Sequence, residues 1–229
     1  MKHEGKHECK PECKHDCKHE CNLRNAYEEA YRLSCERLLE CDSDTVCQNT
    51  KAVFSSETNT YSVRYFNQEC RIKCENGSVI FEKPEETDTT EKVLILHYLV
   101  YARPVPLTGK HISFKEVPDG GSIYYDPFKK RAIDPLVKTF SNNLEGLVAS
   151  AKSIGGGPET LGDVSVVVPV FPLVPVTYVI WQGDEEIGSD GTILFDSSVD
   201  SFLPAEDIVV AASIGTYSMI RAWKNRKEF

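Results

Sequence analysis

The amino-terminal segment is a repeat that no hydrophobic core could accommodate. Residues 1–21 read MKHEGKHECKPECKHDCKHEC, with charged side chains at most of the positions between the cysteines and histidines. The cysteines recur every four residues, at Cys9, Cys13, Cys17 and Cys21. Three histidines each stand two residues before a cysteine, at His7, His15 and His19. Because thiolates and imidazoles at this density bind metals, residues 1–22 are expected to form a Cys/His-rich metal-binding tail that is disordered without metal.

The spacing of the repeat leaves the identity of the metal open. On a helix, positions four apart lie on one face about 6 Å from each other, so several thiolates could reach one ion or cluster. In an extended chain the same positions lie about 13 Å apart, which is too far for one tetrahedral site. The interval matches neither the usual zinc-finger spacing nor the bacterial ferredoxin run. Zinc and an iron–sulfur cluster therefore both remain candidates, and the alternative is a solvated tail that binds metal only opportunistically.

Cysteine usage and hydropathy indicate a cytoplasmic protein. The chain has nine cysteines, an odd number, and residues 1–22 contain no apolar stretch that could serve as a signal peptide. The longest apolar stretch, residues 164–181, is interrupted by Pro169, Pro172 and Pro175. Since each proline removes a backbone donor, a transmembrane helix is not expected there. We expect reduced thiols, a cytoplasmic location and no membrane association.

The distribution of charge argues against nucleic-acid binding. The net charge is −9, and the tail contributes nothing to it because its five lysines balance five acidic residues. The body is therefore acidic and would repel a phosphate backbone. The expected partner is a protein.

Hydrophobic periodicity in the first half of the body predicts helices and an antiparallel meander. A helix is expected over residues 23–41, with Asn22 as the cap that separates it from the tail. Alternation of apolar residues between 61 and 81, with a turn at Asn76-Gly77, predicts short antiparallel strands. A second helix should begin after Asp88, which forms a capping box with Glu91.

The second half alternates irregularly between the two kinds of element. Strands are expected at residues 112–117, 164–168, 174–181 and 193–195, and helices at 127–140 and 144–153, with a flexible connection at 155–158. A long final helix should start at Pro204, with Lys224, Arg226 and Lys227 at its far end. This order favours an α+β fold: one globular domain, residues 23–229, of mixed short strands and helices with a long C-terminal helix.

Two groups in the body are candidate functional sites. One is a metal or redox site in addition to the tail, at Cys41, Cys47, Cys70 and Cys74. The alternative for these thiols, and the preferred one for Cys35, is that they are small buried hydrophobic residues. The second is a polar cleft formed by Asp184, Glu185, Glu186 and Asp196. Its alternative is a solvated turn after a strand, and His97 is expected to be a packing residue rather than a base.

Several stretches of the body resemble a known prokaryotic family. They are ILHYL (95–99), PLTGKHISFKEVPDGG (106–121), VPVTYVIWQGDEE (174–186), ILFDSSV (193–199) and FLPAEDI (202–208). The chain resembles family 3786 of the domains of unknown function over residues 23–229, and departs from it at the tail and at Cys70 and Cys74. Members similar to this chain are common in anaerobes, and some are fused to an iron–sulfur module like that of the corrinoid iron–sulfur protein. The resemblance thus implies a setting of corrinoid and one-carbon metabolism rather than an activity.

These observations favour a non-catalytic accessory protein. Its tail would bind zinc or an iron–sulfur cluster, and its acidic domain would dock on a protein partner such as a corrinoid or iron–sulfur enzyme. One alternative is a protein-binding scaffold with an incidental tail. Another is an enzyme that uses the carboxylates around Asp184 and Asp196.

Overall fold

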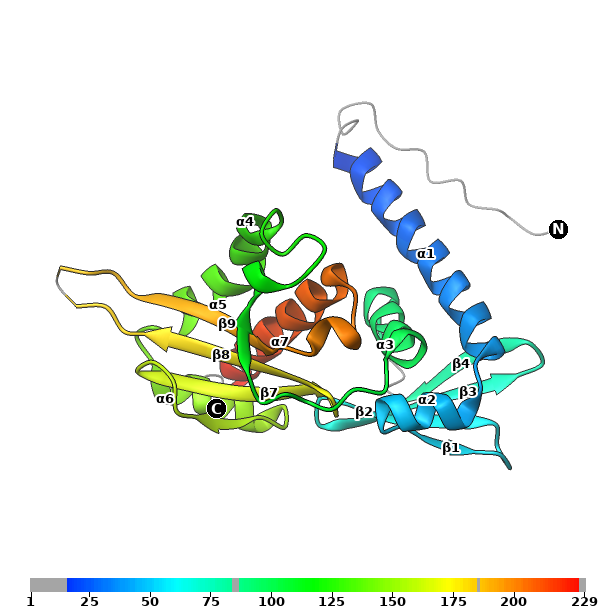
Figure 1. The fold of residues 1–229 in the computed structure, drawn as a ribbon. Helices are drawn as coiled ribbons and strands as arrows, with labels where there is room; N and C mark the ends of the chain where they lie inside the picture. The colour runs from blue at the N-terminus through cyan, green and yellow to red at the C-terminus, as the bar shows by residue number, and fades with distance from the viewer. Residues whose placement is uncertain (1–15, 84–86, 185, 227–229) are drawn as a thin grey trace.

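Two antiparallel sheets and the helices packed on them make up the protein in a computed structural model (Figure 1). The structure describes residues 16–83, 87–184 and 186–226, and for residues 16–24 and Lys83 it describes the backbone alone. The first sheet has the strand order β1-β2-β3-β4, and the second has the order β5-β9-β8-β7-β6. Mixed helices and antiparallel strands that end in a long helix confirm the α+β prediction.

The first helix begins earlier than predicted. Helix α1 spans Asp16–Glu40, so Asn22 lies inside the helix and is not its cap. The C-terminal half of α1 packs against α3 and β4, and buries Ser34 and Leu38. Helix α2, Ser43–Thr50, follows directly, and its cap residue Asp42 accepts a hydrogen bond from the amide of Thr45 at 2.9 Å. The helix prediction was therefore correct in kind and wrong at its start.

The expected meander forms the first sheet. Its strands are β1 (Val53–Ser55), β2 (Thr60–Tyr65), β3 (Gln68–Glu75) and β4 (Ser78–Lys83). Asn76 and Gly77 connect β3 to β4 with φ values of 51° and 73°, as a tight hairpin turn requires. The alternating residues Tyr61, Val63 and Tyr65 are all buried.

Helix α3, Thr89–Tyr101, is the central helix of the molecule. Asp88 caps it as predicted, accepting a hydrogen bond from the Glu91 amide at 2.8 Å. Its residues 93–96 are all buried, so the helix is covered on several sides rather than on one apolar face. Tyr98 stacks on Phe171 of the second sheet, with ring centroids 4.1 Å apart. The helix thus joins the two sheets into one core.

The segment after α3 departs from the predicted pattern twice. Strand β5 covers only His111–Ser113, because Glu116 accepts hydrogen bonds from the Ser113 amide and hydroxyl and turns the chain into the 3-10 helix Phe114–Glu116 (η1). The helix expected at 127–140 is present in three parts: α4 (Tyr125–Phe128), the π-helix Lys129–Ile133 (η2) and α5 (Asp134–Phe140). Helix α6, Leu144–Ser153, has the predicted bounds.

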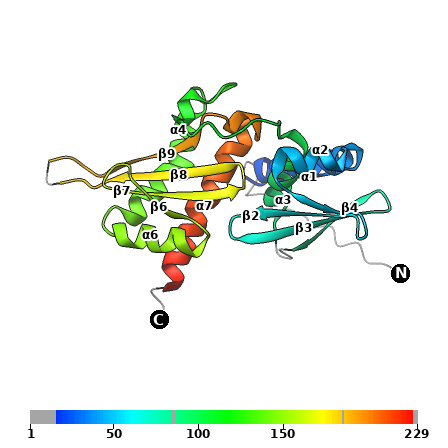
Figure 2. The same cartoon turned by 60° about the horizontal axis from the view of Figure 1, so that its bottom comes forward.

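The second sheet contains the β-branched runs. Its longer strands are β7 (Val164–Phe171), β8 (Val174–Trp181) and β9 (Asp190–Asp196). Strand β6, Gly157–Glu159, pairs with β7 as an edge strand, so the connection expected to be flexible is partly ordered. Pro169 and Pro175 face each other beside an irregularity at the β7–β8 hairpin, a position where the sheet tolerates missing donors. The sheets adjoin at the β2–β3 turn, where the Phe66 amide donates to the Val170 carbonyl at 2.9 Å (Figure 2).

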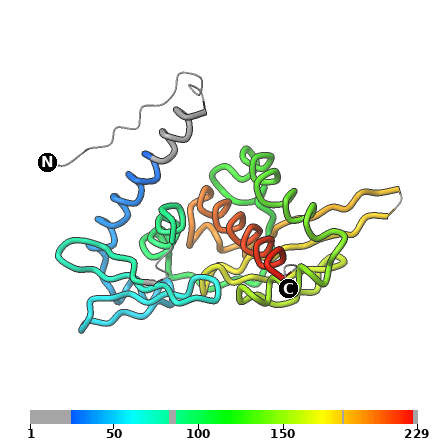
Figure 3. Tube along the Cα trace, turned by 180° about the vertical axis from the view of Figure 1, so that it is seen from behind, coloured from blue at the N-terminus to red at the C-terminus, as the bar shows by residue number. Residues whose placement is uncertain are grey.

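Helix α7, Ala205–Arg226, follows the 3-10 helix Val199–Ser201 (η3) and packs against β7, α5 and α6. Seen from behind, it crosses the second sheet with α3 beside it (Figure 3). Tyr178 of β8 donates its hydroxyl to the Ala212 carbonyl at 3.0 Å. A side chain at Gly215 would meet that hydroxyl at 2.0 Å, so glycine is required for this close approach. None of the helices that the structure describes is both long and apolar enough to cross a bilayer.

Candidate functional site

The predicted metal-binding tail lies mostly outside the described residues. This applies to Cys9, Cys13, His7 and His15. The backbone at Cys17, His19 and Cys21 belongs to α1 and is helical. Positions 17 and 21 are therefore one helical turn apart, which is the arrangement that the helical reading of the repeat requires.

The body cysteines are free thiols in packed surroundings. Cys70 and Cys74 lie on the buried side of β3, and Cys35, Cys41 and Cys47 are half-buried in or beside α1 and α2. Burial raises the pKa of all five, and it raises the pKa of Cys70 to about 12. A thiol that keeps its proton is a poor nucleophile and a poor metal ligand.

No three His, Cys, Asp or Glu side chains within the described part of the chain are arranged to hold a metal ion. Cys41, Cys47, Cys70 and Cys74 do not form such a group in the described part of the chain, and a second metal or redox site there stays a prediction. Their burial and raised pKa values are those of small hydrophobic residues, the alternative that the sequence left open.

The structure does not bring the proposed polar cleft together. Asp184 and Glu186 lie in the β8–β9 loop, beside the first residue of β9, and Glu185 is outside the described residues. Asp196 is the last residue of β9. Since each strand residue adds about 3.3 Å, the two ends of this seven-residue strand lie about 20 Å apart. The Asp184 carboxylate accepts hydrogen bonds from the amides of Glu186 and Ile187. It therefore stabilises the turn in which it lies.

Asp196 has a structural role. Its Oδ1 accepts hydrogen bonds from the amides and hydroxyls of Thr108 and Ser198, and its Oδ2 accepts one from the Gly109 amide at 2.7 Å. Burial alone would raise the pKa of this carboxyl, but these hydrogen bonds outweigh it and lower the pKa to about 2. Through these hydrogen bonds the carboxylate holds the loop before β5 against the end of β9.

His97 pairs with a carboxylate that lies 110 residues further along the chain. Its Nδ1 is 2.6 Å from Oδ2 of Asp207, and both side chains are largely buried. The pair joins the middle of α3 to the first turn of α7. His97 is therefore a satisfied packing residue, as expected, whereas Asp207 does more than stabilise its own helix.

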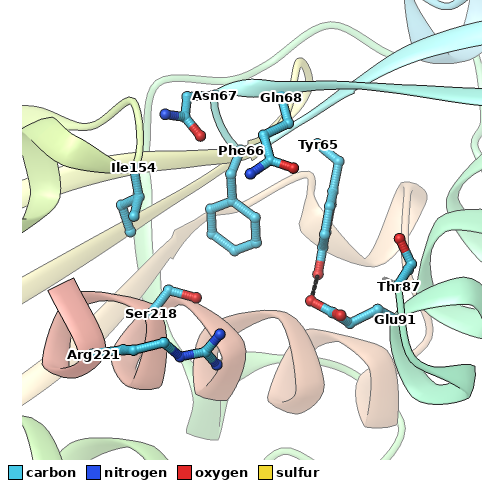
Figure 4. Close-up of a pocket in the computed structure, with 9 residues that line it drawn as sticks. All are labelled: Tyr65, Phe66, Asn67, Gln68, Thr87, Glu91, Ile154, Ser218 and Arg221. Carbon is cyan, nitrogen blue, oxygen red and sulfur yellow. Dashed lines mark hydrogen bonds between the residues drawn. The ribbon is translucent and has the colours of Figure 1, made fainter. Parts of the chain in front are cut away.

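A polar hollow lies where the β2–β3 turn, α3 and α7 converge (Figure 4). Its volume is about 290 Å³. In Figure 4 Arg221 reaches into it from α7, and Glu91 faces it from the first turn of α3. Tyr65 donates its hydroxyl to Oε1 of Glu91 at 3.0 Å, and burial together with that carboxylate raises the pKa of the tyrosine, which stays protonated.

A second hollow of about 410 Å³ continues from the first along α7. The two share Glu91, Ser218 and Arg221. Arg131, carried by the π-helix, lines the far part of the second hollow. We call the two hollows together the α7 groove. The hydroxyl of Thr216 donates to the Ala132 carbonyl at 3.2 Å and ties the π-helix to α7.

Sequence reasoning missed the α7 groove. Glu91 was recognised only as a helix-capping partner, and Arg221 and Arg131 carried no motif. A π-helix is often associated with functional positions, but it has no sequence signal of its own. The convergence of residues 65–68, 87–91 and 217–221 depends on tertiary packing alone.

Comparison with known families identifies the class of protein. The family model described as a domain of unknown function (DUF3786) matches residues 42–217. The chain therefore belongs to this family, as its second half indicated, and the match covers both sheets, α3 and most of α7. No curated protein and no solved structure matches the chain.

Proposed function

We propose that this member of the family is a non-catalytic accessory protein that binds a metal ion or an iron–sulfur cluster through its N-terminal Cys/His repeat. The observation that carries the proposal is the four-residue spacing of Cys9, Cys13, Cys17 and Cys21, together with the helical backbone at the last two positions. Successive thiolates on such a helix would lie about 6 Å apart, close enough to share a metal site.

The donor set fits such a group. Four thiolates are suitable ligands for zinc or for an iron–sulfur cluster, and both sites favour sulfur over oxygen. His7, His15 and His19 would supply nitrogen ligands or hydrogen bonds at the edge of the site. The body cysteines are buried or half-buried in the packed domain, which makes them less accessible to a metal ion than a solvated repeat would be.

The proposed partner is a corrinoid or iron–sulfur enzyme in the cytoplasm. The body carries the whole net charge of −9, which favours docking on a basic protein surface and disfavours nucleic acid. The tail would then present its metal or cluster close to the docked enzyme.

The test is metal and sulfide analysis of the full chain purified without oxygen, before and after reconstitution with iron and sulfide or with zinc. The test variant replaces the four tail cysteines with serine. The matched control replaces Cys35, Cys41, Cys47 and Cys74 with alanine. We expect the tail variant to lose the bound metal and the control to keep it. Metal content that is equal in the wild type and the tail variant would refute the proposal.

A second candidate, a protein-binding scaffold with an incidental tail, is favoured by one observation. The family match begins at residue 42, so the part of the chain shared with other members excludes the tail. Deleting residues 1–22, which removes all four tail cysteines, separates the two candidates. A scaffold would bind the partner enzyme with unchanged affinity, whereas a metal-presenting tail predicts weaker binding or no transfer of metal.

A further inference from the structure

The α7 groove contains two arginine side chains, Arg221 and Arg131. Arg221 makes no hydrogen bond or ion pair with any residue that the structure describes, although its side chain reaches into the groove (Figure 4). Arg131 lines the second hollow and carries five N–H groups. Two arginines therefore line the second hollow, and each carries five N–H donors.

The acidic side chains of the groove are already partly used. Oε1 of Glu91 accepts the Tyr65 hydroxyl, and Oδ1 of Asp88 accepts the Glu91 amide. The groove also contains the first turn of α3, a 13-residue helix whose leading amides point out of the helix end. The N–H donors of the two arginines and of this helix end suit an anion with several acceptor oxygens.

The wall of the groove includes a strained residue. Phe66 has φ of 52°, in the left-handed region, where a bulky aromatic residue is a true outlier. Such strain costs about 1–3 kcal/mol and is concentrated at ligand clamps and active sites. The Phe66 amide is held by the Val170 carbonyl at 2.9 Å, and the ring projects into the hollow opposite Ser218 (Figure 4).

We propose that the α7 groove binds a small dianionic metabolite, with one acidic group on Arg221 and the other near Arg131. Cavities of about 290 and 410 Å³ suit a compact molecule of metabolite size. A second acidic group is proposed because a monoanion could pair with only one of the two arginines, whereas a dianion can pair with both and so offset the repulsion from a body with a net charge of −9. This site is independent of the tail and does not rest on metal binding.

The test is titration of the full chain with succinate and with glycerol 3-phosphate, which separate carboxylate from phosphate recognition. Acetate is the singly charged control ligand, and calorimetry at low ionic strength is the readout. We expect at least one dianion to bind more tightly than acetate. Arg221→Gln should weaken binding about tenfold or more, because the paired, charge-assisted hydrogen bonds from the guanidinium to the anion are lost.

Two further variants make the test specific. Lys224→Gln removes the same charge one turn further along α7, outside the groove, and should leave binding unchanged. Arg131→Gln should reduce the affinity for the dianion to that for acetate. If neither dianion binds, or if Lys224→Gln and Arg221→Gln weaken binding equally, the proposal is wrong. Metal content is measured separately, so failure here leaves the tail proposal untouched.

Discussion

Replacing Asp196 with asparagine should destabilise the protein more than any other exchange of a single carboxylate for an amide. In the wild type Oδ1 accepts four hydrogen bonds and Oδ2 accepts one from the Gly109 amide at 2.7 Å. If the asparagine oxygen keeps the four bonds, its NH₂ group must face the Gly109 N–H. Two donors would then oppose each other at a site where the side chain is 6% exposed.

The magnitude follows from the pKa of this carboxyl and from the lost bond. Lowering the pKa from 3.8 to about 2 corresponds to about 2 kcal/mol of stability at neutral pH. The opposed donors add about 1 kcal/mol, so we expect a loss of about 3 kcal/mol for Asp196→Asn at pH 7. Because the pKa is lower in the folded state, the wild-type advantage is complete above about pH 4. It disappears as the pH falls through about 2.

Urea unfolding followed by tryptophan fluorescence at several pH values between 7 and 2.5 measures this difference. Asp184→Asn is the matched control, since Asp184 also accepts two backbone amides but is fully exposed and should contribute far less. The free-energy gap between the wild type and Asp196→Asn should narrow with falling pH. A gap that stays constant with pH, or one no larger than that of Asp184→Asn, would refute the reasoning.

Three other exchanges test separate parts of the structure. His97→Ala should cost about 2 kcal/mol in urea unfolding, because it leaves the buried carboxylate of Asp207 without its partner. An equally large loss in a protein that already carries Asp207→Asn would contradict that coupling. Lys51→Gly should raise the melting temperature by stabilising the fold by about 0.5–1 kcal/mol, since Lys51 ends α2 with φ of 61°. A melting temperature of Lys51→Gly below that of Lys51→Ala would contradict this prediction. In the native protein Cys70, with its pKa of about 12, should resist alkylation at pH 7 until urea unfolds the chain. Mass spectrometry of the labelled peptides measures this, and rapid labelling without urea would show the burial to be wrong.

Local signals were sufficient for most of the elements. Asp88 and Asn76-Gly77 act through their immediate neighbours, so the start of α3 and the β3–β4 turn could be predicted. Errors arose where a contact distant in sequence changes the local preference. Gly157 and Pro158 lack strand propensity but pair with β7, whose apolar residues fix the edge of the sheet.

The candidate sites were harder to predict from the sequence than the secondary structure, because they depend on tertiary packing. Asp184 and Asp196 are 12 residues apart in sequence, yet Asp184 lies in the loop before β9 and Asp196 is the last residue of that strand. Glu91 and Arg221 are 130 residues apart and face one hollow. The tail could be identified from its cysteine and histidine content alone. The α7 groove could not, because it forms only where three segments distant in sequence pack together.

Helix α1 gives the tail and the body a physical connection. It starts at Asp16, within the Cys/His repeat, and runs unbroken to Glu40, where Leu38 is buried against the core. Nucleating a helix is costly whereas adding residues to an existing one is cheap. Metal binding at Cys9 and Cys13 would therefore extend a helix that the body already stabilises, with Pro11 tolerated in its first turn. By linkage, a metal that binds only the helical form of the tail would also stabilise α1, because both depend on one continuous helix.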